Sequence, residues 1–203
     1  MKKLLLSLLF LSNAFCADPI YDYVKEIPVD LHGWFGNRNQ LNWFFQRRDI
    51  NSVIELGSWT GLSAVYFGEK VGPDGVVFAV DTWLGSVTEG VHKKDPRLNY
   101  LYQLFLSNVK NKGLQDVIVP IRMKTTEAAK ALNITADLIY VDADHRTEPV
   151  RKDIIDWYPH LNEGGLMCGD DWDWASVRKG VKAAAQELGK EVHNAGAFWW
   201  FSE

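Results

Sequence analysis

The sequence predicts a three-layer, doubly wound α/β fold, in which helices cover both faces of a mostly parallel sheet. First, short apolar runs of strand length alternate along the chain with segments of helical spacing. Second, each run is continuously apolar, as at residues 76–80, which is typical of parallel strands that are buried on both faces. Third, two short apolar runs flank a turn at Ala195-Gly196, which predicts an antiparallel strand at the C-terminal edge.

The composition indicates one globular domain. With 203 residues, of which 47% are apolar and 24% are charged, the chain is long enough to bury a sizeable core. A net charge of -4, without any dense Lys/Arg cluster, predicts no nucleic-acid partner. Nine tryptophans are unusual and indicate either an aromatic core or a pocket for flat apolar groups. The oligomeric state is not indicated.

Residues 1–16 predict a secretory signal peptide, which takes no part in the fold. Two lysines precede an apolar run at 4–11, and the small residues Ala14 and Cys16 mark a cleavage site before Ala17. The run is too short to span a bilayer, so we expect no transmembrane segment in the mature chain. We expect a periplasmic or secreted protein if the signal is used, and a cytoplasmic one otherwise.

Two alternatives stay open for this end of the chain. The apolar run is also compatible with an N-terminal helix that packs on the domain. Cys16 is also a candidate for lipidation, although Phe15 is large where such signals prefer a small residue. If cleavage follows Cys16, Cys168 is the sole remaining cysteine, and the mature chain forms no internal disulfide.

Residues 17–50 predict a cap segment ahead of the main domain. A helix is expected at 37–48, and aromatic side chains are dense both before and within it. We expect this segment to lie over the C-terminal edge of the sheet. The alternative is a helix that packs against the sheet and touches no ligand.

The main domain, residues 51–203, begins with a strand at 52–57, which is followed by a helix at about 60–70. A Gly-Pro-Asp-Gly turn then leads to the strand that ends at Asp81. The later elements continue this alternation, and glycines mark several of their boundaries. They are a helix around 98–109, a strand at 117–121, a helix near 125–132, a strand at 138–142, a helix around 150–161, a strand at 166–170, a helix at 175–188, and strands near 192 and at 198–201.

The segment ELGSWTG at residues 55–61 predicts a nucleoside-binding loop between a strand and a helix N-terminus. Asp81 ends the next strand, where a doubly wound fold places the carboxylate that binds a ribose. Trp59 stands where a dinucleotide loop needs glycine, which argues against an NAD-dependent dehydrogenase, and no GKS or GKT follows. A nucleoside without phosphates, such as S-adenosylmethionine, fits Trp59 and the acidic Glu55. The alternative is an ordinary strand-turn-helix.

Acidic residues stand at the ends of several predicted strands, namely Asp81, Asp142, Asp144, Asp170 and Asp171. One right-handed crossover joins the strands at 138–142 and 166–170, so we expect these strands to be neighbours and their acidic ends to converge. Carboxylates gathered in this way repel one another unless they share a proton or hold a cation such as Mg²⁺ or Ca²⁺. The alternative is that some of these residues only cap helices.

Four motifs together resemble those of class I S-adenosylmethionine-dependent methyltransferases, in the small-molecule O-methyltransferase-like branch. They are residues 55–61, 80–86, 137–145 and 164–171, and the resemblance extends over about residues 50–203. It implies the Rossmann-like seven-stranded sheet of that class. It also implies a methyl transfer to a hydroxyl of a small-molecule acceptor, such as a sugar or an aromatic compound.

The resemblance also implies roles for individual residues. The loop would hold the methionine end of the methyl donor, Asp81 the ribose, Trp83 the face of the adenine and Thr125 its edge. The implied donor-binding set is Glu55, Gly57, Ser58, Trp59, Gly61, Asp81, Thr82, Trp83, Thr125 and Asp142.

For the chemistry, the resemblance implies a divalent cation, Mg²⁺ or another, held by Asp142, Asp170 and Asp171. Asp144 resembles the general base of sugar O-methyltransferases, but His145 beside it departs from that pattern, so either residue is a candidate catalytic base. The alternative function is an exported, non-catalytic ligand-binding protein on the same fold, because the methyl donor is made in the cytoplasm.

Overall fold

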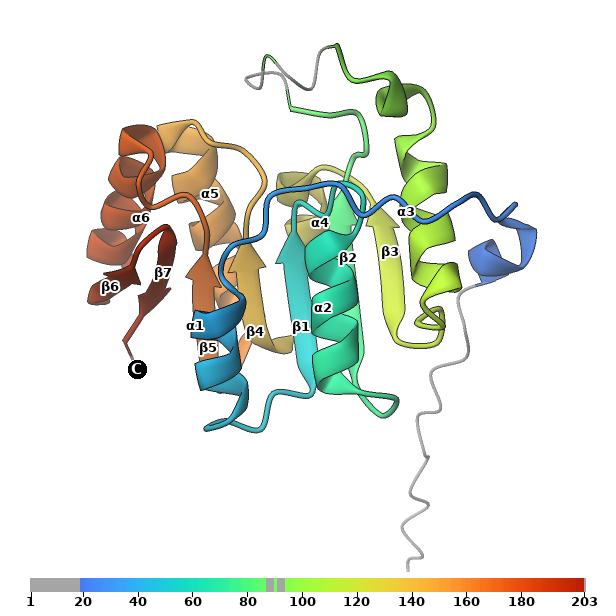
Figure 1. The fold of residues 1–203 in the computed structure, drawn as a ribbon. Helices are drawn as coiled ribbons and strands as arrows, with labels where there is room; N and C mark the ends of the chain where they lie inside the picture. The colour runs from blue at the N-terminus through green and yellow to red at the C-terminus, as the bar shows by residue number, and fades with distance from the viewer. Residues whose placement is uncertain (1–18, 87–89, 91–93, 203) are drawn as a thin grey trace, which may run out of the picture.

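The fold, obtained as a computed structural model, is a seven-stranded sheet between two layers of helices (Figure 1). The structure describes residues 19–86, 90 and 94–202. The predicted signal peptide at 1–16 lies outside these residues. In the part of the chain that is described, no helix is long and apolar enough to cross a membrane.

The strand order is β3-β2-β1-β4-β5-β7-β6, and β7 is antiparallel to both of its neighbours while the other pairs are parallel. This confirms the predicted doubly wound sheet with its antiparallel C-terminal strand. The strands are β1 (Ser52–Leu56), β2 (Val76–Asp81), β3 (Ile118–Arg122), β4 (Ala136–Val141), β5 (Leu161–Gly169), β6 (Val192–Ala195) and β7 (Phe198–Phe201).

The helices lie close to their predicted positions. They are α1 (Arg38–Phe45), α2 (Leu62–Val71), α3 (Leu101–Asn111), α4 (Thr125–Ala131), α5 (Thr147–Trp157) and α6 (Ala175–Leu188), with short 3₁₀ turns at Pro19–Tyr23, Pro96–Asn99 and Tyr158–His160. One boundary differs from the prediction, because α5 stops at Trp157 and Leu161 already belongs to β5. Pro159 explains the early stop, since proline has no N–H to continue the helical hydrogen bonds.

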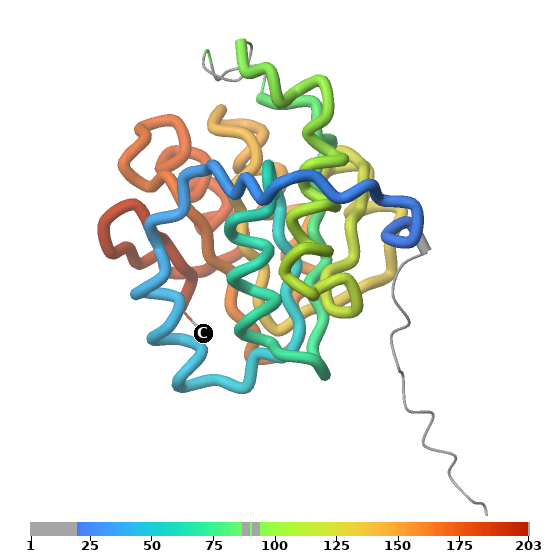
Figure 2. The backbone as a smooth tube through the Cα atoms, turned by 45° about the vertical axis from the view of Figure 1, so that its right-hand side comes forward, coloured from blue at the N-terminus to red at the C-terminus, as the bar shows by residue number. Residues whose placement is uncertain are grey.

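Alternate residues of the strands face two separate cores, as expected for a sheet that is covered on both sides. On one face, Val53, Val77 and Leu138 pack with residues of α1, α2 and α3. On the other face, Ile54 and Ile139 pack with residues of α4, α5 and α6. Figures 1 and 2 show these two helical layers on either side of the strands.

The parallel strands are in register, so that their carboxyl ends reach one edge of the sheet together. Leu56 pairs with both Val80 and Val141, and Val141 pairs with Gly169. The residues that follow β1, β4 and β5 therefore stand side by side. This register brings the chemistry-bearing motifs of the sequence to one edge.

The cap segment begins with a 3₁₀ turn and continues as an extended stretch that crosses α3 partway along that helix and passes the upper end of α2 before it reaches α1 (Figure 1). Its extended part contacts the loop after β1, because the Thr60 hydroxyl donates to the carbonyl of His32 at 2.8 Å. Helix α1, by contrast, packs on the sheet, where Leu41 and Phe44 are buried. The extended part therefore lies near the carboxyl edge of the sheet, as expected of a cap. Helix α1 packs against the sheet, as in the alternative.

Candidate active site

Backbone strain is concentrated at the carboxyl edge of the sheet. Among the described residues, three that are not glycine have positive φ, and they are Trp59 (φ 48°), Trp83 (φ 52°) and Asp171 (φ 59°). They follow β1, β2 and β5, respectively. Such conformations cost of order 1–3 kcal/mol each and persist where surrounding contacts enforce them, most often at functional sites.

The loop after β1 requires glycine at its first position. Gly57 has a φ of 91°, and a Cβ atom there would lie 2.0 Å from the backbone oxygen of Asp142. The loop is hydrogen-bonded on both sides. The N–H of Gly57 donates to the carbonyl of Val80, and the N–H of Asp142 donates to the carbonyl of Leu56. The loop is thus fixed between the neighbouring strands β2 and β4.

Asp81 fastens this loop. Its Oδ2 accepts hydrogen bonds from the backbone N–H groups of Ser58 and Trp59, both at 2.9 Å, and its Oδ1 accepts one from the N–H of Trp83 at 2.7 Å. The carboxylate remains partly exposed. Asp81 therefore lies where a ribose contact was predicted, but its first structural effect is to hold the donor loop and the loop after β2 together.

Trp83 does not occupy the predicted position against an adenine. Its side chain is only 1% exposed, and its ring packs against Tyr102 and Phe105, with centroids 4.6 and 4.7 Å away. Its indole N–H donates to the carbonyl of Trp59 at 2.9 Å. A ring that is buried on both faces cannot stack on a ligand, so the structure gives Trp83 a packing role instead.

Glu55 lies in the interior of β1 and is completely buried. Burial raises the pKa of its carboxyl group to about 7, while the hydrogen bond from Ser58 and the nearby Ser63 hydroxyl oppose this rise. Ser58 donates to Oε2, whereas the buried Oε1 accepts no hydrogen bond from the described residues, although Ser63 is near. A buried acceptor without a donor suits a ligand that brings an N–H group of its own.

Thr82 and Thr125 lie at the same edge of the sheet, after β2 and β3 respectively. The Thr82 hydroxyl accepts from the N–H of Leu84 at 3.3 Å. Thr125, the first residue of α4, donates its hydroxyl to Asp153 at 2.6 Å. Burial raises the pKa of Asp153 to about 7. These hydroxyls have protein partners, and the roles predicted for them toward the donor stay predictions.

A second group of side chains stands at the ends of β4 and β5, beside the loop. His145 Nε2 lies 2.8 Å from Asp171 Oδ2 and 3.9 Å from Asp142 Oδ1. One potential ligand atom from each of the three residues lies within 4.8 Å of the other two. Two carboxylates and one imidazole form a donor set that divalent ions accept. We call this group the Asp-His-Asp centre.

Like charges and burial dominate the electrostatics of this centre. Burial raises the pKa of Asp142 well above its usual range, His145 opposes the rise, and the nearby charges of Asp170 and Asp171 add to it. A small cavity is lined by the three residues of the centre and by Asp144 and Asp170, among others. The protein thus gathers negative charge where a cation or a proton would relieve repulsion.

The predicted metal ligand Asp170 does not belong to this centre. It is 9% exposed, and its carboxylate accepts from the N–H of Asp171 at 2.7 Å and from the Tyr140 hydroxyl at 3.3 Å. Tyr140 also accepts from Nδ2 of Asn37 at 3.1 Å. Asp170 lines the same cavity, but the structure groups His145 and not Asp170 with Asp142 and Asp171, so its predicted role as a metal ligand stays a prediction.

Asp144, one of the two predicted bases, is engaged by its neighbour. Arg146 donates to both of its carboxylate oxygens, through Nε at 3.0 Å and Nη2 at 2.6 Å. Burial acts to raise the pKa of Asp144, but the hydrogen bonds and charge of Arg146 outweigh it, so the pKa is lowered. A carboxylate with a lowered pKa is a poor proton acceptor near neutral pH.

Two residues of the site were not singled out from the sequence, Tyr140 and Asn37. Tyr140 lies in a continuous apolar run. Its hydroxyl is the feature of the sequence that could have indicated a role in the site, because a buried phenol needs a hydrogen-bond partner.

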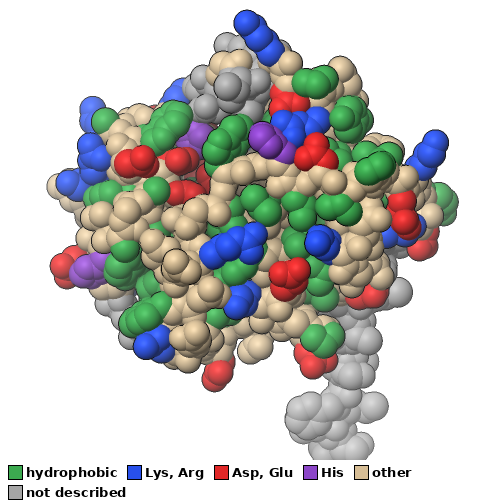
Figure 3. Space-filling model, in the orientation of Figure 1, with side chains coloured by type: hydrophobic (Ala, Val, Ile, Leu, Met, Phe, Trp, Pro, Cys, Tyr) green, Lys and Arg blue, Asp and Glu red, His purple; other side chains and the backbone are tan. Residues whose placement is uncertain are grey.

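Around the Asp-His-Asp centre, the ring of His145 lies 4.9 Å from that of Trp174, which is 43% exposed. Figure 3 shows acidic, histidine and hydrophobic side chains together on the upper part of the molecule.

Fold and site together define a doubly wound α/β protein with a strained, glycine-bearing loop after β1 beside an Asp-His-Asp centre. A family model described as a methyltransferase domain matches residues 54–172. The chain belongs to this methyltransferase family. Its fold is that of class I S-adenosylmethionine-dependent O-methyltransferases, which confirms the resemblance seen in the four motifs.

Solved structures of several proteins share this fold. The O-methyltransferase TomG from Streptomyces achromogenes, involved in tomaymycin synthesis and in complex with SAM, has a TM-score of 0.64 at 14% identity, over 94% of this chain and 86% of that one. An O-methyltransferase from Bacillus cereus, in complex with SAH, has a TM-score of 0.59 at 13% identity, over 86% and 84%.

A precorrin 8w decarboxylase from Methanobacterium thermoautotrophicum has a TM-score of 0.60 at 15% identity, over 85% of this chain and 81% of that one. Identities this low establish the fold, and a reaction must be argued from the site. No curated protein sequence matches this chain.

Proposed function

We propose that this methyltransferase moves the methyl group of S-adenosylmethionine to a hydroxyl of a small-molecule acceptor. The observation that supports this is the juxtaposition of two groups at one sheet edge. The buried Glu55 lies in β1 and the strained loop follows that strand, while the Asp-His-Asp centre follows β4 and β5, the next strands in the sheet. Transfer from an activated sulfonium needs mainly positioning of donor and acceptor, which such a juxtaposition supplies.

The residues of the donor side fit S-adenosylmethionine. The buried Oε1 of Glu55 has no hydrogen-bond donor in the described part of the chain, and the α-ammonium group of the methionine end would supply one. Asp81 keeps partly exposed carboxylate oxygens beside the loop, where they can accept from ribose hydroxyls. Complexes with SAM and with SAH exist for two proteins of this fold.

On the acceptor side, Asp142, His145 and Asp171 would hold a divalent cation. An ion there would lower the pKa of an acceptor hydroxyl and orient it. The two carboxylates of this donor set suit ions such as Mg²⁺ and Mn²⁺, and its imidazole nitrogen suits ions such as Fe²⁺, Ni²⁺ and Zn²⁺. We assign the acceptor's proton to this centre and not to Asp144, because Arg146 occupies the carboxylate of Asp144.

Calorimetric titration of the protein with S-adenosylhomocysteine tests the donor site. We expect saturable binding by the wild-type protein, and about tenfold weaker binding or worse by Asp81→Ala, which loses both the ribose acceptor and the contacts that hold the loop. Lack of binding by a folded wild-type protein would refute the donor site.

Methyl transfer is tested with radiolabelled S-adenosylmethionine and a panel of phenol, catechol and sugar acceptors, with and without a chelator. Labelled product supports the proposal and excludes a non-catalytic binding protein. Turnover that chelation leaves unchanged would refute the role of the cation and leave the donor site intact. Donor binding without turnover on any acceptor would favour the non-catalytic alternative.

A further inference from the structure

The extended part of the cap segment is attached to one helix through side chains. This stretch, residues 27–35, which we call the strap, contains no helix or strand. The N–H of Ile27 donates to Oγ of Ser107 at 2.8 Å, and that hydroxyl donates to the carbonyl of Ile27 at 3.1 Å. One turn along α3, Nδ2 of Asn111 donates to the same carbonyl at 3.0 Å. Polar side chains of α3 thus take the place of a neighbouring strand.

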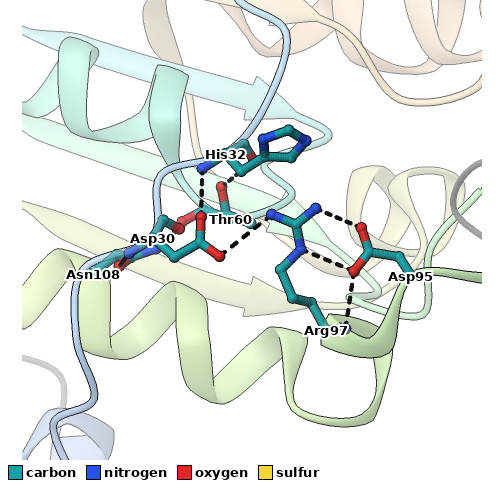
Figure 4. Close-up of polar contacts among 6 residues, drawn as sticks. All are labelled: Asp30, His32, Thr60, Asp95, Arg97 and Asn108. Atoms are coloured by element: carbon teal, nitrogen blue, oxygen red, sulfur yellow. Dashed lines mark hydrogen bonds and ion pairs between the residues drawn. The ribbon is translucent and has the colours of Figure 1, made fainter.

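Asn108 joins the strap to the donor loop. Its Oδ1 accepts from the N–H of Asp30 at 3.0 Å, and its Nδ2 donates to the carbonyls of Asp30 and Thr60, both at 2.8 Å (Figure 4). The side chain is completely buried. One accepted and two donated bonds fix the amide orientation, because a flipped amide would set its oxygen against two carbonyls.

A second connection between strap and loop lies beside the first. The Thr60 hydroxyl donates to the carbonyl of His32, and the N–H of His32 donates to Oδ1 of Asp30 at 3.0 Å. Arg97 extends the network, since its guanidinium lies 3.4 Å from Asp30 and 2.6 Å from Asp95 (Figure 4). The strap is therefore fixed to α3, to the donor loop and to the turn before α3.

Thr60 needs such contacts because of its neighbours in the loop. It stands between Trp59 and Gly61, and both have positive φ, at 48° and 95°. A backbone of this shape is held by its surroundings and not by local preference. A second carbonyl of the loop, that of Trp59, accepts from the indole N–H of Trp83, which follows β2. Asn108 bonds the carbonyl of Thr60 from α3.

We infer that Asn108 is a positioning residue for the methyl donor and that the strap is coupled to donor binding through it. The inference rests on the proposed function, in which the loop binds S-adenosylmethionine. A loop that is already held in its binding conformation loses less entropy when the ligand binds, so the contacts of Asn108 strengthen binding without touching the donor. Coupling is reciprocal, so a bound donor must also stabilise the strap on the loop.

The test compares Asn108→Ala with Asn111→Ala, its matched control on the same helix. Both variants remove an asparagine that bonds the strap, but only Asn108 contacts the donor loop. Titrated with S-adenosylhomocysteine below its melting temperature, Asn108→Ala should bind about tenfold more weakly than wild type, since a buried carbonyl loses its donor. Asn111→Ala should stay within about twofold.

Hydrogen exchange distinguishes coupling from a purely structural role of Asn108, because only coupling makes the protection of the strap amides depend on the ligand. In the wild type, S-adenosylhomocysteine should slow the exchange of the Asp30 and His32 amides, and in Asn108→Ala this protection should shrink by the factor lost in affinity. Thr60→Val, which removes only the hydroxyl contact with His32, gives the second variant if Asn108→Ala does not fold, and it too should weaken binding.

Wild-type affinity in Asn108→Ala, or in Thr60→Val where that variant replaces it, would overturn the coupling alone. Exchange rates of the strap amides that S-adenosylhomocysteine leaves unchanged would also overturn the coupling. A wild-type protein that binds no S-adenosylhomocysteine would overturn the donor site and, with it, this inference. The two failures are therefore distinguishable.

Discussion

His145 Nε2 lies 2.8 Å from Asp171 Oδ2, so the segment after β4 and the segment after β5 meet through these two side chains. The contact depends on the left-handed backbone of Asp171, which turns this residue toward His145 while Asp170 stays in the interior. It joins an imidazole and a carboxylate that lie 26 positions apart in the chain, and Asp142 completes the group.

Metal binding should separate the members of this centre from Asp170. We expect His145→Ala and Asp171→Asn to weaken Mn²⁺ binding about tenfold or more, because each removes one possible ligand. Asp170→Asn should stay within about threefold, since it removes only a nearby charge. Electron paramagnetic resonance of free Mn²⁺ measures the affinity of each variant for the ion. A loss in Asp170→Asn as large as that in Asp171→Asn, with little loss in His145→Ala, would mean that the cation is held by the three carboxylates that the sequence indicated.

Turnover should depend more on His145 than on Asp144. On an acceptor that the wild type methylates, His145→Ala should lose about a hundredfold or more in kcat, as expected for the loss of a ligand to the cation that would lower the pKa of the acceptor hydroxyl. Asp144→Asn should lose much less, because Arg146 already engages that carboxylate. Steady-state kinetics at saturating donor measure both, and the reverse order would return the role of base to Asp144.

Glu55 should make stability depend on pH. Because the folded pKa of about 7 lies above the ordinary glutamate value of 4.5, the protonated form is favoured on folding. The folded state is therefore most stable below pH 4.5 with respect to this group, and it loses roughly 3 kcal/mol as the pH rises from 4.5 to 7. Glu55→Gln should remove this loss, so its stability in urea should exceed that of the wild type at pH 8.

The control for Glu55→Gln is the same measurement at pH 4.5, where both proteins carry a neutral group and should differ little. A wild-type stability that is flat between pH 4.5 and 7 after correction for other groups, or a Gln variant that is weaker at pH 8, would contradict the buried, protonated carboxyl.

Gly57→Ala should unfold the protein or cost several kcal/mol, because the new Cβ would meet the Asp142 carbonyl at 2.0 Å, where φ is also positive. Gly36→Ala is the matched control, since a Cβ there meets nothing within 4 Å. Thermal unfolding followed by circular dichroism compares them. A Gly57→Ala variant as stable as the control would show that the loop and β4 are not in close contact.

We propose that the signal at residues 1–16 is used and that the mature chain begins at Ala17. Expression with this leader in a bacterial host and N-terminal sequencing of the product measure the cleavage. A product that keeps Met1 and stays in the cytoplasm would contradict export.

Local sequence patterns were sufficient for most of the architecture. Continuous apolar runs predicted the parallel strands, because strands that are buried on both faces are mostly apolar. Turn glycines predicted where several strands and helices begin and end. The positions of Glu55, Asp81 and Asp142 at one edge followed as well, since the carboxyl ends of parallel strands meet there. The methyltransferase motifs at these ends were therefore readable from the chain alone.

The directions of individual side chains were decided only by the tertiary structure. Asp170 and Asp171 are adjacent and chemically alike, yet one bonds Tyr140 inside the protein and the other meets His145. Trp83, read as a ligand contact, is buried against α3 instead. The contacts of Asn108 join segments that are 48 and 78 positions away. Residue spacing determines which face and edge a side chain reaches, but its partners depend on backbone turns and on distant segments that local patterns do not specify.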